Sequence, residues 1–317
     1  MPEKPNANLI KDTTKKPETE SGTGLEISNS SELEKLSGAI GVVQDAVNHD
    51  QTVKVGQLEQ IQEAIKKLRV NFYGEEMTIE EINKIPKLEE SIKIWEEIRQ
   101  GNLENKEKLT LLNPEIAEKL SHWDGELYLY NLYFLSAQAA EAIAHNKGDL
   151  QLGGFASISD ETAEKLSHFQ GVMLWLPSLT SLSDKAAEYL SHLKGTLSLG
   201  GLTSLSDKAA EHLSCHGGGF HHRSSGTYLY NQLRLRGLTS LSDKAAKYLS
   251  RHQGDLDLGG LTSLSDKAAE HLSCHQDGLE LDGLTSLSDK AAEYLSKYKG
   301  KIYVSEAIKQ QIDKFKK

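Results

Sequence analysis

The chain has 317 residues, of which 38% are hydrophobic, 26% charged and 6% aromatic, so it can form a folded core and is neither fibrous nor disordered throughout. Its 46 acidic residues against 36 basic ones give a formal net charge of −10, which argues against nucleic acid or an anionic membrane as partner, since both need a basic face. No run of about 18 apolar residues occurs, so no membrane-inserted helix is expected.

The N-terminal third divides into a tail and a helical region. Residues 1–29 are rich in Lys, Thr, Glu and Asn and have no apolar signal-peptide core, which predicts a disordered tail on a protein that is cytoplasmic or exported without a Sec signal. Over 30–108, apolar residues step by three and four, which predicts four short helices. The third begins at the capping box formed by Thr78 and Glu81, and the fourth follows Pro86. This region is either a cap for the following domain or an independent helical bundle.

An internal repeat dominates the rest of the chain. From residue 125 to residue 299 the sequence restarts about every 23 residues, which gives seven full copies. The segments 109–124, a half copy, and 300–317, an amphipathic Lys-rich tail, are expected to be caps at the two ends. A period of this length with recurring leucines is typical of a solenoid, in which each unit buries its apolar face against its neighbours.

The copy at 254–276 shows how each unit is expected to fold. Leu256 and Leu258 alternate with polar residues, which predicts a short strand with one buried face. Ser265 and Asp266 provide a helix N-cap and a first-turn carboxylate, and two alanines and a leucine follow at helical spacing. The glycine that opens most copies is expected to end the preceding helix in a left-handed C-cap.

This unit resembles the leucine-rich repeat family in its bacterial-type 23-residue form, and within that family the cysteine-containing subtype. The subtype runs L-x-L-x-x-C-x-x-I-T-D-x-x-L-x-x-L, and residues 256–272 read LDLGGLTSLSDKAAEHL. Leu261 stands where the subtype has Cys, and the unit is shorter. The resemblance implies a curved solenoid that binds another macromolecule along its concave strand face and performs no chemistry. The expected fold is therefore α/β: a leucine-rich-repeat solenoid over 109–299, preceded by a small all-α segment.

The copies differ from one another mainly at the outward positions of the strands. The stretch Leu-Thr-Ser-Leu-Ser-Asp-Lys-Ala-Ala is identical in five copies, even at its exposed Lys, so drift alone does not account for the contrast. The strand face is therefore predicted to bind a partner. The candidate binding residues on it are Tyr128, Tyr130, Gln151, Trp175, Ser198, Arg234, Arg236, Asp257 and Glu280. The aromatic members would equally suit a saccharide, and Trp175 could instead pack beside Pro177.

A 13-residue insertion, 218–230, interrupts the copies and is rich in aromatic residues. Inserted loops in repeat proteins often serve binding, which makes Phe220 and Arg223 candidate contacts. The alternative is a truncated repeat, because 226–231 resembles 125–131.

The two cysteines, Cys215 and Cys274, occupy the same position of two copies with a third between them, which is too far for a disulfide. Cys215 and His216, with His221 and His222 just beyond, have the residue types of a zinc site. Against a site, the position of His216 holds Trp, Asn, Phe, Leu or Tyr in other copies, which indicates packing. Neither a metal nor another cofactor is therefore expected.

Catalysis finds little support in the sequence. No nucleophile elbow, P-loop, metalloprotease helix or dinucleotide turn is present. Adjacent residues on a helix point apart, so Cys215 and His216 do not form a nucleophile pair. We expect a non-catalytic protein–protein interaction scaffold that uses the strand face and the 218–230 loop. Recognition of a carbohydrate or cell-surface ligand, and a zinc-binding module, are the alternatives.

Overall fold

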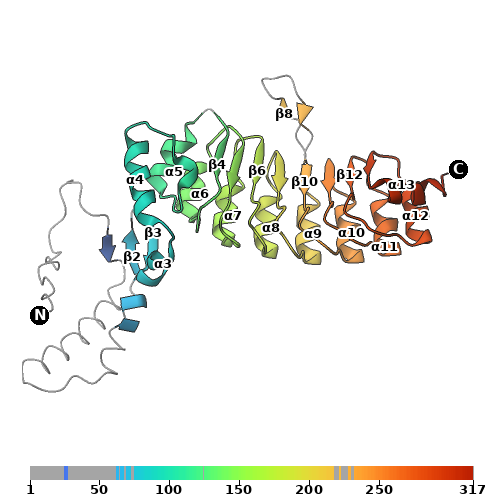
Figure 1. Ribbon diagram of the computed structural model, residues 1–317, viewed down its shortest axis with the longest axis horizontal. Coiled ribbons are helices and arrows are strands. Elements are labelled where there is room, and N and C mark those ends of the chain that lie inside the picture. Colours follow the sequence, from blue (N-terminus) through green and yellow to red (C-terminus); the bar gives the residue numbers. More distant parts are fainter. Residues whose placement is uncertain are drawn as a thin grey trace, which may run out of the picture.

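The computed structural model describes residues 25–27, 62–63, 65–67, 69–72, 75–123, 125–217, 221–222, 228–229 and 232–316. Its main feature is an eight-stranded sheet whose order along the sheet, β4-β5-β6-β7-β10-β11-β12-β13, follows the chain. All of its strand pairs are parallel, and helices alternate with the strands and lie on the opposite side from them (Figure 1). The strands are β4 (Leu127–Leu129), β5 (Leu150–Leu152), β6 (Met173–Trp175), β7 (Thr196–Ser198), β10 (Gln232–Arg234), β11 (Asp255–Asp257), β12 (Leu279–Glu280) and β13 (Ile302–Tyr303).

Each strand from β4 to β12 carries a leucine that points into the core, as the alternating pattern predicts. These leucines stand in register from strand to strand, for example Leu197 with Leu233 and Leu233 with Leu256. From β4 to β12 all of them are at most 1% exposed. Stacking therefore buries apolar surface that one 23-residue unit could not bury alone.

Each helix of the seven full copies begins at a serine N-cap, which confirms the expected start signal, and the helix of the half copy begins at Asn113. The side chain of Ser265, for example, accepts a hydrogen bond from the backbone N–H of Ala268. The same serine also donates to the carboxylate of Asp243 in the preceding repeat. This Ser–Asp bond recurs along the array and gives the identical Leu-Ser-Asp stretch a structural reason. The helices are α5 (Pro114–Ser121), α6 (Ala137–Ile143), α7 (Asp160–Leu166), α8 (Asp184–Leu190), α9 (Asp207–Leu213), α10 (Asp243–Leu249), α11 (Asp266–Leu272) and α12 (Asp289–Ser296).

The predicted left-handed glycine C-cap is wrong for most copies. The C-cap is usually a serine in right-handed helical conformation, such as Ser191 with φ −64° and ψ −18°. Among the described glycines at repeat boundaries, only Gly217 and Gly254 have positive φ, at 131° and 132°. Glycine is needed for a different reason, because a Cβ on Gly171 would lie 2.1 Å from the carbonyl oxygen of Gly148, one repeat earlier. Close approach of neighbouring backbones, and not helix termination, selects glycine here.

The expectation of an all-α N-terminal region is wrong. A three-stranded antiparallel sheet pairs β1 (Leu25–Ile27) with β2 (Arg69–Phe72) and β2 with β3 (Glu75–Thr78). β1 falls in the expected tail, and β2 follows directly on the second expected helix. A run of β-formers followed by Gly74 is a hairpin signal that the helical reading overlooked. The first expected helix lies outside the described residues, and of the second only 62–63 and 65–67 are described, as helix.

The third and fourth expected helices are present as α3 (Ile79–Lys84), with the Thr78 capping box, and α4 (Leu88–Arg99). α4 packs against the half copy that precedes the first full repeat. Trp95 is fully buried, and its Nε1 donates a hydrogen bond to the carbonyl of Leu111 at 3.1 Å. Helix α4 therefore covers the first end of the leucine core, while the 3₁₀ turn η1 (Lys106–Lys108) leads into the array.

The C-terminal end is covered in a similar way. β13 adds a last strand to the sheet, and α13 (Glu306–Asp313) buries Ile308 and Ile312. One hydrophobic core runs from Met77 to Ile312.

The described residues of the insertion, 221–222 and 228–229, add no strand to the large sheet. β8 (His221–His222) and β9 (Tyr228–Leu229) form their own antiparallel pair, seen above the row of strands in Figure 1. β10 pairs directly with β7 across the insertion. Phe220 and Arg223 lie outside the described residues.

Candidate functional site

The predicted binding residues lie in one row across the sheet. The strand register pairs Tyr128 with Gln151, and Trp175 with Ser198, so each residue stands beside its equivalent in the next repeat. The complete row is Tyr128, Gln151, Trp175, Ser198, Arg234, Asp257, Glu280 and Tyr303. Side chains alternate along a strand, so this row points away from the leucine core. Tyr130 and Arg236 follow two residues after Tyr128 and Arg234 in the sequence.

The N-terminal end of this face is aromatic. The rings of Tyr128 and Tyr130 stack with centroids 5.7 Å apart and planes 7° from parallel. The Tyr128 hydroxyl donates to the Glu126 carboxylate, and this bond, with burial and the Glu126 charge, raises the Tyr128 pKa to about 12. Tyr130 is 46% exposed. The pair therefore offers an exposed ring, while one of its hydroxyls is already engaged.

Trp175 is half-buried between Gln151 and Ser198, its neighbours in register, and is less open than the sequence suggests. Its indole Nε1 is buried and has no hydrogen-bond partner among the described residues. A buried indole N–H usually finds an acceptor. The half-exposed ring still belongs to the strand face.

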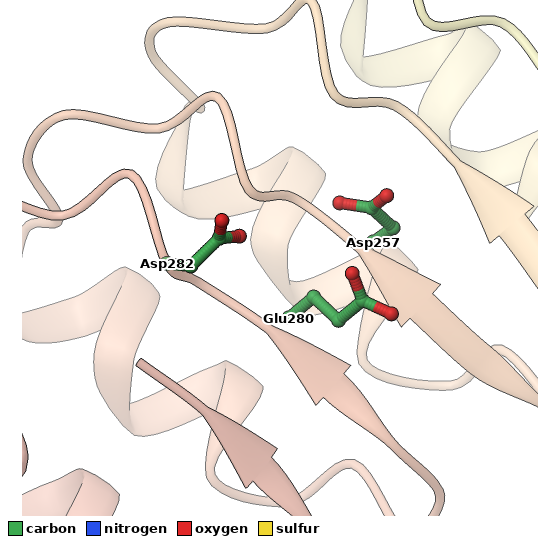
Figure 2. Close-up of side chains that lie close together, drawn as sticks. All are labelled: Asp257, Glu280 and Asp282. Atoms are coloured by element: carbon green, nitrogen blue, oxygen red, sulfur yellow. The ribbon is translucent and has the colours of Figure 1, made fainter. Parts of the chain in front are cut away.

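The C-terminal half of the face is charged. Three carboxylates, those of Asp257, Glu280 and Asp282, converge at the ends of β11 and β12 (Figure 2). The guanidinium of Arg236 bridges them, at 3.3 Å from Asp257, at 3.4 Å from Glu280 and closest to Asp282. The outward strand pattern contains Asp282, but the predicted set of binding residues omits it, because its role depends on Arg236, which lies 46 residues earlier in the chain.

Asp257 departs from expectation, because it lies on the outward face yet is only 4% exposed. It accepts a hydrogen bond from the N–H of Gly259 at 2.9 Å and one from Arg236. Burial, followed by the nearby charge of Asp257, raises the pKa of Glu280 against the opposing effect of Arg236. The cluster thus holds more negative charge than its arginine offsets.

The described part of the chain contains no other group of His, Cys, Asp or Glu side chains spaced to hold a metal ion. In this cluster Arg236 already supplies a positive charge to the three carboxylates. We therefore regard the cluster as an ion network of the surface.

Two adjoining hollows make a groove along this half of the face. One, of about 550 Å³, is bordered by Pro177, Ser198 and Arg234, and the other, of about 690 Å³, by Tyr303, α13 and the charged cluster. Arg236 and Glu280 line both. We call the combined hollow the strand-face groove; its lining residues are Pro177, Ser198, Gly200, Gln232, Arg234, Arg236, Asp257, Glu280, Asp282, Ile302, Tyr303, Val304, Glu306, Lys309, Ile312, Asp313 and Lys316.

Arg234 is a cation of the groove that has no ion pair with the described residues. Its Nε donates to the side chain of Gln232 at 2.8 Å. No carboxylate among the described residues lies within ion-pair distance of its guanidinium. It can therefore bind an acceptor group on a ligand without first breaking an internal ion pair.

The cysteine and histidine candidates for zinc do not share a site in the described structure. Cys215 is exposed and its thiol donates to the carbonyl of Glu211 at 3.8 Å, whereas His216 is 1% exposed. The side chains of His221 and His222 lie outside the described part. Both cysteines are free thiols.

No model of a known protein family matches the chain, and no curated protein matches it. Within the residues that the structure describes, no helix combines the length and apolar character needed to cross a membrane. The chain is thus an α/β repeat protein, with a parallel sheet that alternates with helices in a manner consistent with a solenoid.

Proposed function

We propose that the chain is a leucine-rich-repeat solenoid that serves as a non-catalytic scaffold and binds an extended segment of a partner protein in the strand-face groove. The observation that carries this proposal is the groove itself, which is lined by residues that differ from copy to copy. From β6 to β13 it crosses five strand intervals, or roughly 24 Å at about 4.8 Å each, which matches roughly seven extended residues.

The chemistry of the groove supports a segment with both polar and apolar side chains. Arg234 offers free donors to an acceptor on the partner, and Trp175 and Pro177, at and just beyond the end of β6, provide apolar surface two strands away. Aromatic residues and arginine are the residue types that most often dominate binding energy. The 218–230 loop, which precedes β10 in the sequence, would provide a second contact.

The test is affinity capture with matched variants. The groove variant carries Arg234→Glu and Ser198→Trp, which reverse the free charge and fill the hollow. The control variant carries Lys208→Glu and Glu211→Lys, two exposed positions on the helix side. Both must first give the wild-type circular dichroism spectrum. A protein retained by the wild type and the control but lost by the groove variant supports the proposal. A partner lost only by the control would assign binding to the helix side instead.

Carbohydrate recognition remains a second proposal because of the Tyr128–Tyr130 stack, whose exposed ring offers a flat apolar surface. A glycan array with Tyr130→Ser as the control distinguishes it, since binding of a sugar there must depend on that ring.

A further inference from the structure

Three consecutive repeats place a histidine at the same position, just beyond the ends of α9, α10 and α11. The rings of His216 and His252 are stacked with centroids 5.9 Å apart, and those of His252 and His275 at 6.4 Å. Tyr298 continues the row, 6.5 Å from His275. Successive planes differ by 4°, 9° and 5°, so the four rings form one ladder through the C-terminal half of the array.

The histidines of this ladder are buried without hydrogen bonds. His216, His252 and His275 are 1%, 3% and 2% exposed, and neither ring nitrogen of any of them has a partner among the described residues. Asn146, at the same position of an earlier repeat, is also buried, but it donates to the Trp123 carbonyl and accepts from the Gly148 N–H. The next two repeats place apolar Phe169 and Leu193 there. At this position of the repeat, polar groups without partners are thus confined to the later repeats among the described residues.

The charged groups around the ladder do not compensate a protonated ring. Two hollows lie beside the ladder, and Arg251 lines both. The hollow at His216 is also lined by Glu211 and Cys215. The hollow at His252 is also lined by Lys247, Cys274 and Asp277. The carboxylates of Asp255 and Asp277 already accept the backbone N–H groups of Gly278 and Gly254. Their charges, after burial, raise the pKa of Tyr298.

The direction of the histidine pKa values follows from this burial. Desolvation lowers the pKa of His216 to about 4, against the weaker opposing effect of the nearby backbone of Gly195 and Ser191. It also lowers that of His252 to about 3, with a further decrease from the neighbouring His216 and His275. Such imidazoles are neutral in the folded chain and gain a proton only when the repeats open.

We propose that His216 and His252 make this ladder an acid-sensitive seam, which opens the repeats from α9 to α12 when the pH falls from about 7.5 to about 5.5, while the repeats before it stay folded. Unfolded histidines have a pKa of about 6.5, so between these pH values the open state binds protons that the closed state cannot. The sign is therefore fixed: acid favours opening. His252 and His275 come shortly before β11 and β12 in the chain, so opening would also remove the charged half of the strand-face groove.

Hydrogen exchange followed by mass spectrometry on the full chain at pH 7.5 and pH 5.5, corrected for intrinsic rates, tests this proposal without a partner. Each of His216 and His252, held neutral in the folded chain, adds a factor of roughly ten to the opening constant at pH 5.5. We expect peptides from α9 to α12 to lose at least tenfold protection at the lower pH, and peptides from α5 to α8 to change much less. Equal change in both halves, or none, would overturn the proposal.

Two triple variants separate the ladder from ordinary acid effects. His216→Phe/His252→Phe/His275→Phe uses a residue that the same position already holds at Phe169, and should abolish the acid-induced loss. His145→Gln/His168→Gln/His192→Gln removes three exposed histidines, each one residue before that position in earlier repeats, and should leave the loss intact. If the phenylalanine triple variant does not fold, His252→Phe alone should reduce the pH effect about tenfold. Persistence of the full effect in a folded phenylalanine variant would assign it to carboxylates and refute the seam.

Discussion

The helix side and the strand side of the array are made by the same repeated unit. On the helix side the repeated side chains bond one repeat to the next, whereas on the strand side the outward side chains change from copy to copy. On the helix side, the serine N-caps bond to the aspartate of the repeat before, as Ser206 does to Asp184. On the strand side, the outward row changes from tyrosine through arginine to carboxylate, while the strands pair through their backbones whatever these side chains are. Constancy on one side therefore reflects the contacts between repeats, and variation on the other is free to serve recognition.

The largest difference should appear when a buried leucine is compared with its outward neighbour. Leu256 is fully buried in the continuous core, so Leu256→Ala should lower the free energy of unfolding by about 2–5 kcal/mol. Ser198→Ala, in the outward row, should change it by less than about 0.5 kcal/mol. Urea unfolding of both variants measures the contrast. Comparable losses in the two would mean that the outward row also holds the repeats together.

The next effect concerns two adjacent glycines. A Cβ on Gly201 would lie 2.3 Å from the carbonyl oxygen of Pro177, whereas a Cβ on Gly200 meets nothing closer than 3.9 Å. Gly201→Ala should therefore force neighbouring backbones apart and cost about 1–3 kcal/mol, while Gly200→Ala should cost much less. Thermal unfolding of the two variants separates the steric effect from the change in backbone entropy. Both substitutions are Gly→Ala and change the entropy of the unfolded chain alike, so a difference between them reports the close backbone approach at Gly201. Equal costs would point to backbone entropy as the reason for glycine.

The sequence predicts those parts of the fold that depend on local periodicity, and not those that depend on contacts between repeats. Strand and helix positions followed from Leu256, Ser265 and their equivalents because their periods are local and repeat. The β2–β3 hairpin was not predicted, because the helical spacing of apolar residues over 30–108 is a stronger signal than the single turn residue Gly74. The role of the boundary glycines was also missed, since contact between Gly148 and Gly171 depends on how closely neighbouring repeats approach.

For the candidate site, alternation was enough to find the outward row but not its chemistry. The sequence identified Arg236, Asp257 and Glu280 as members of one face. It did not show that Asp257 is nearly buried or that Asp282 completes the cluster, because these properties arise from side chains of three neighbouring repeats. The histidine ladder was recognised as a packing position, but its lack of hydrogen-bond partners appears only once neighbouring repeats are in place.

The smallest effect should come from the charge network itself. The Arg236 side chain is 49% exposed, so its three ion pairs are weakened by solvent, and Arg236→Gln should cost no more than about 1 kcal/mol at pH 7.5. The difference from wild type should shrink further in 1 M NaCl, where charges are screened within about 3 Å. Urea unfolding at low and high salt measures both values. A loss of more than about 2 kcal/mol in the free energy of unfolding that salt does not reduce would show that strand-side charges stabilise the array. The contrast drawn between the two sides would then be wrong. A small, salt-sensitive loss would show that the ion pairs of Arg236 are weak. The Arg236 cluster could then exchange these internal partners for groups of a bound protein at little cost.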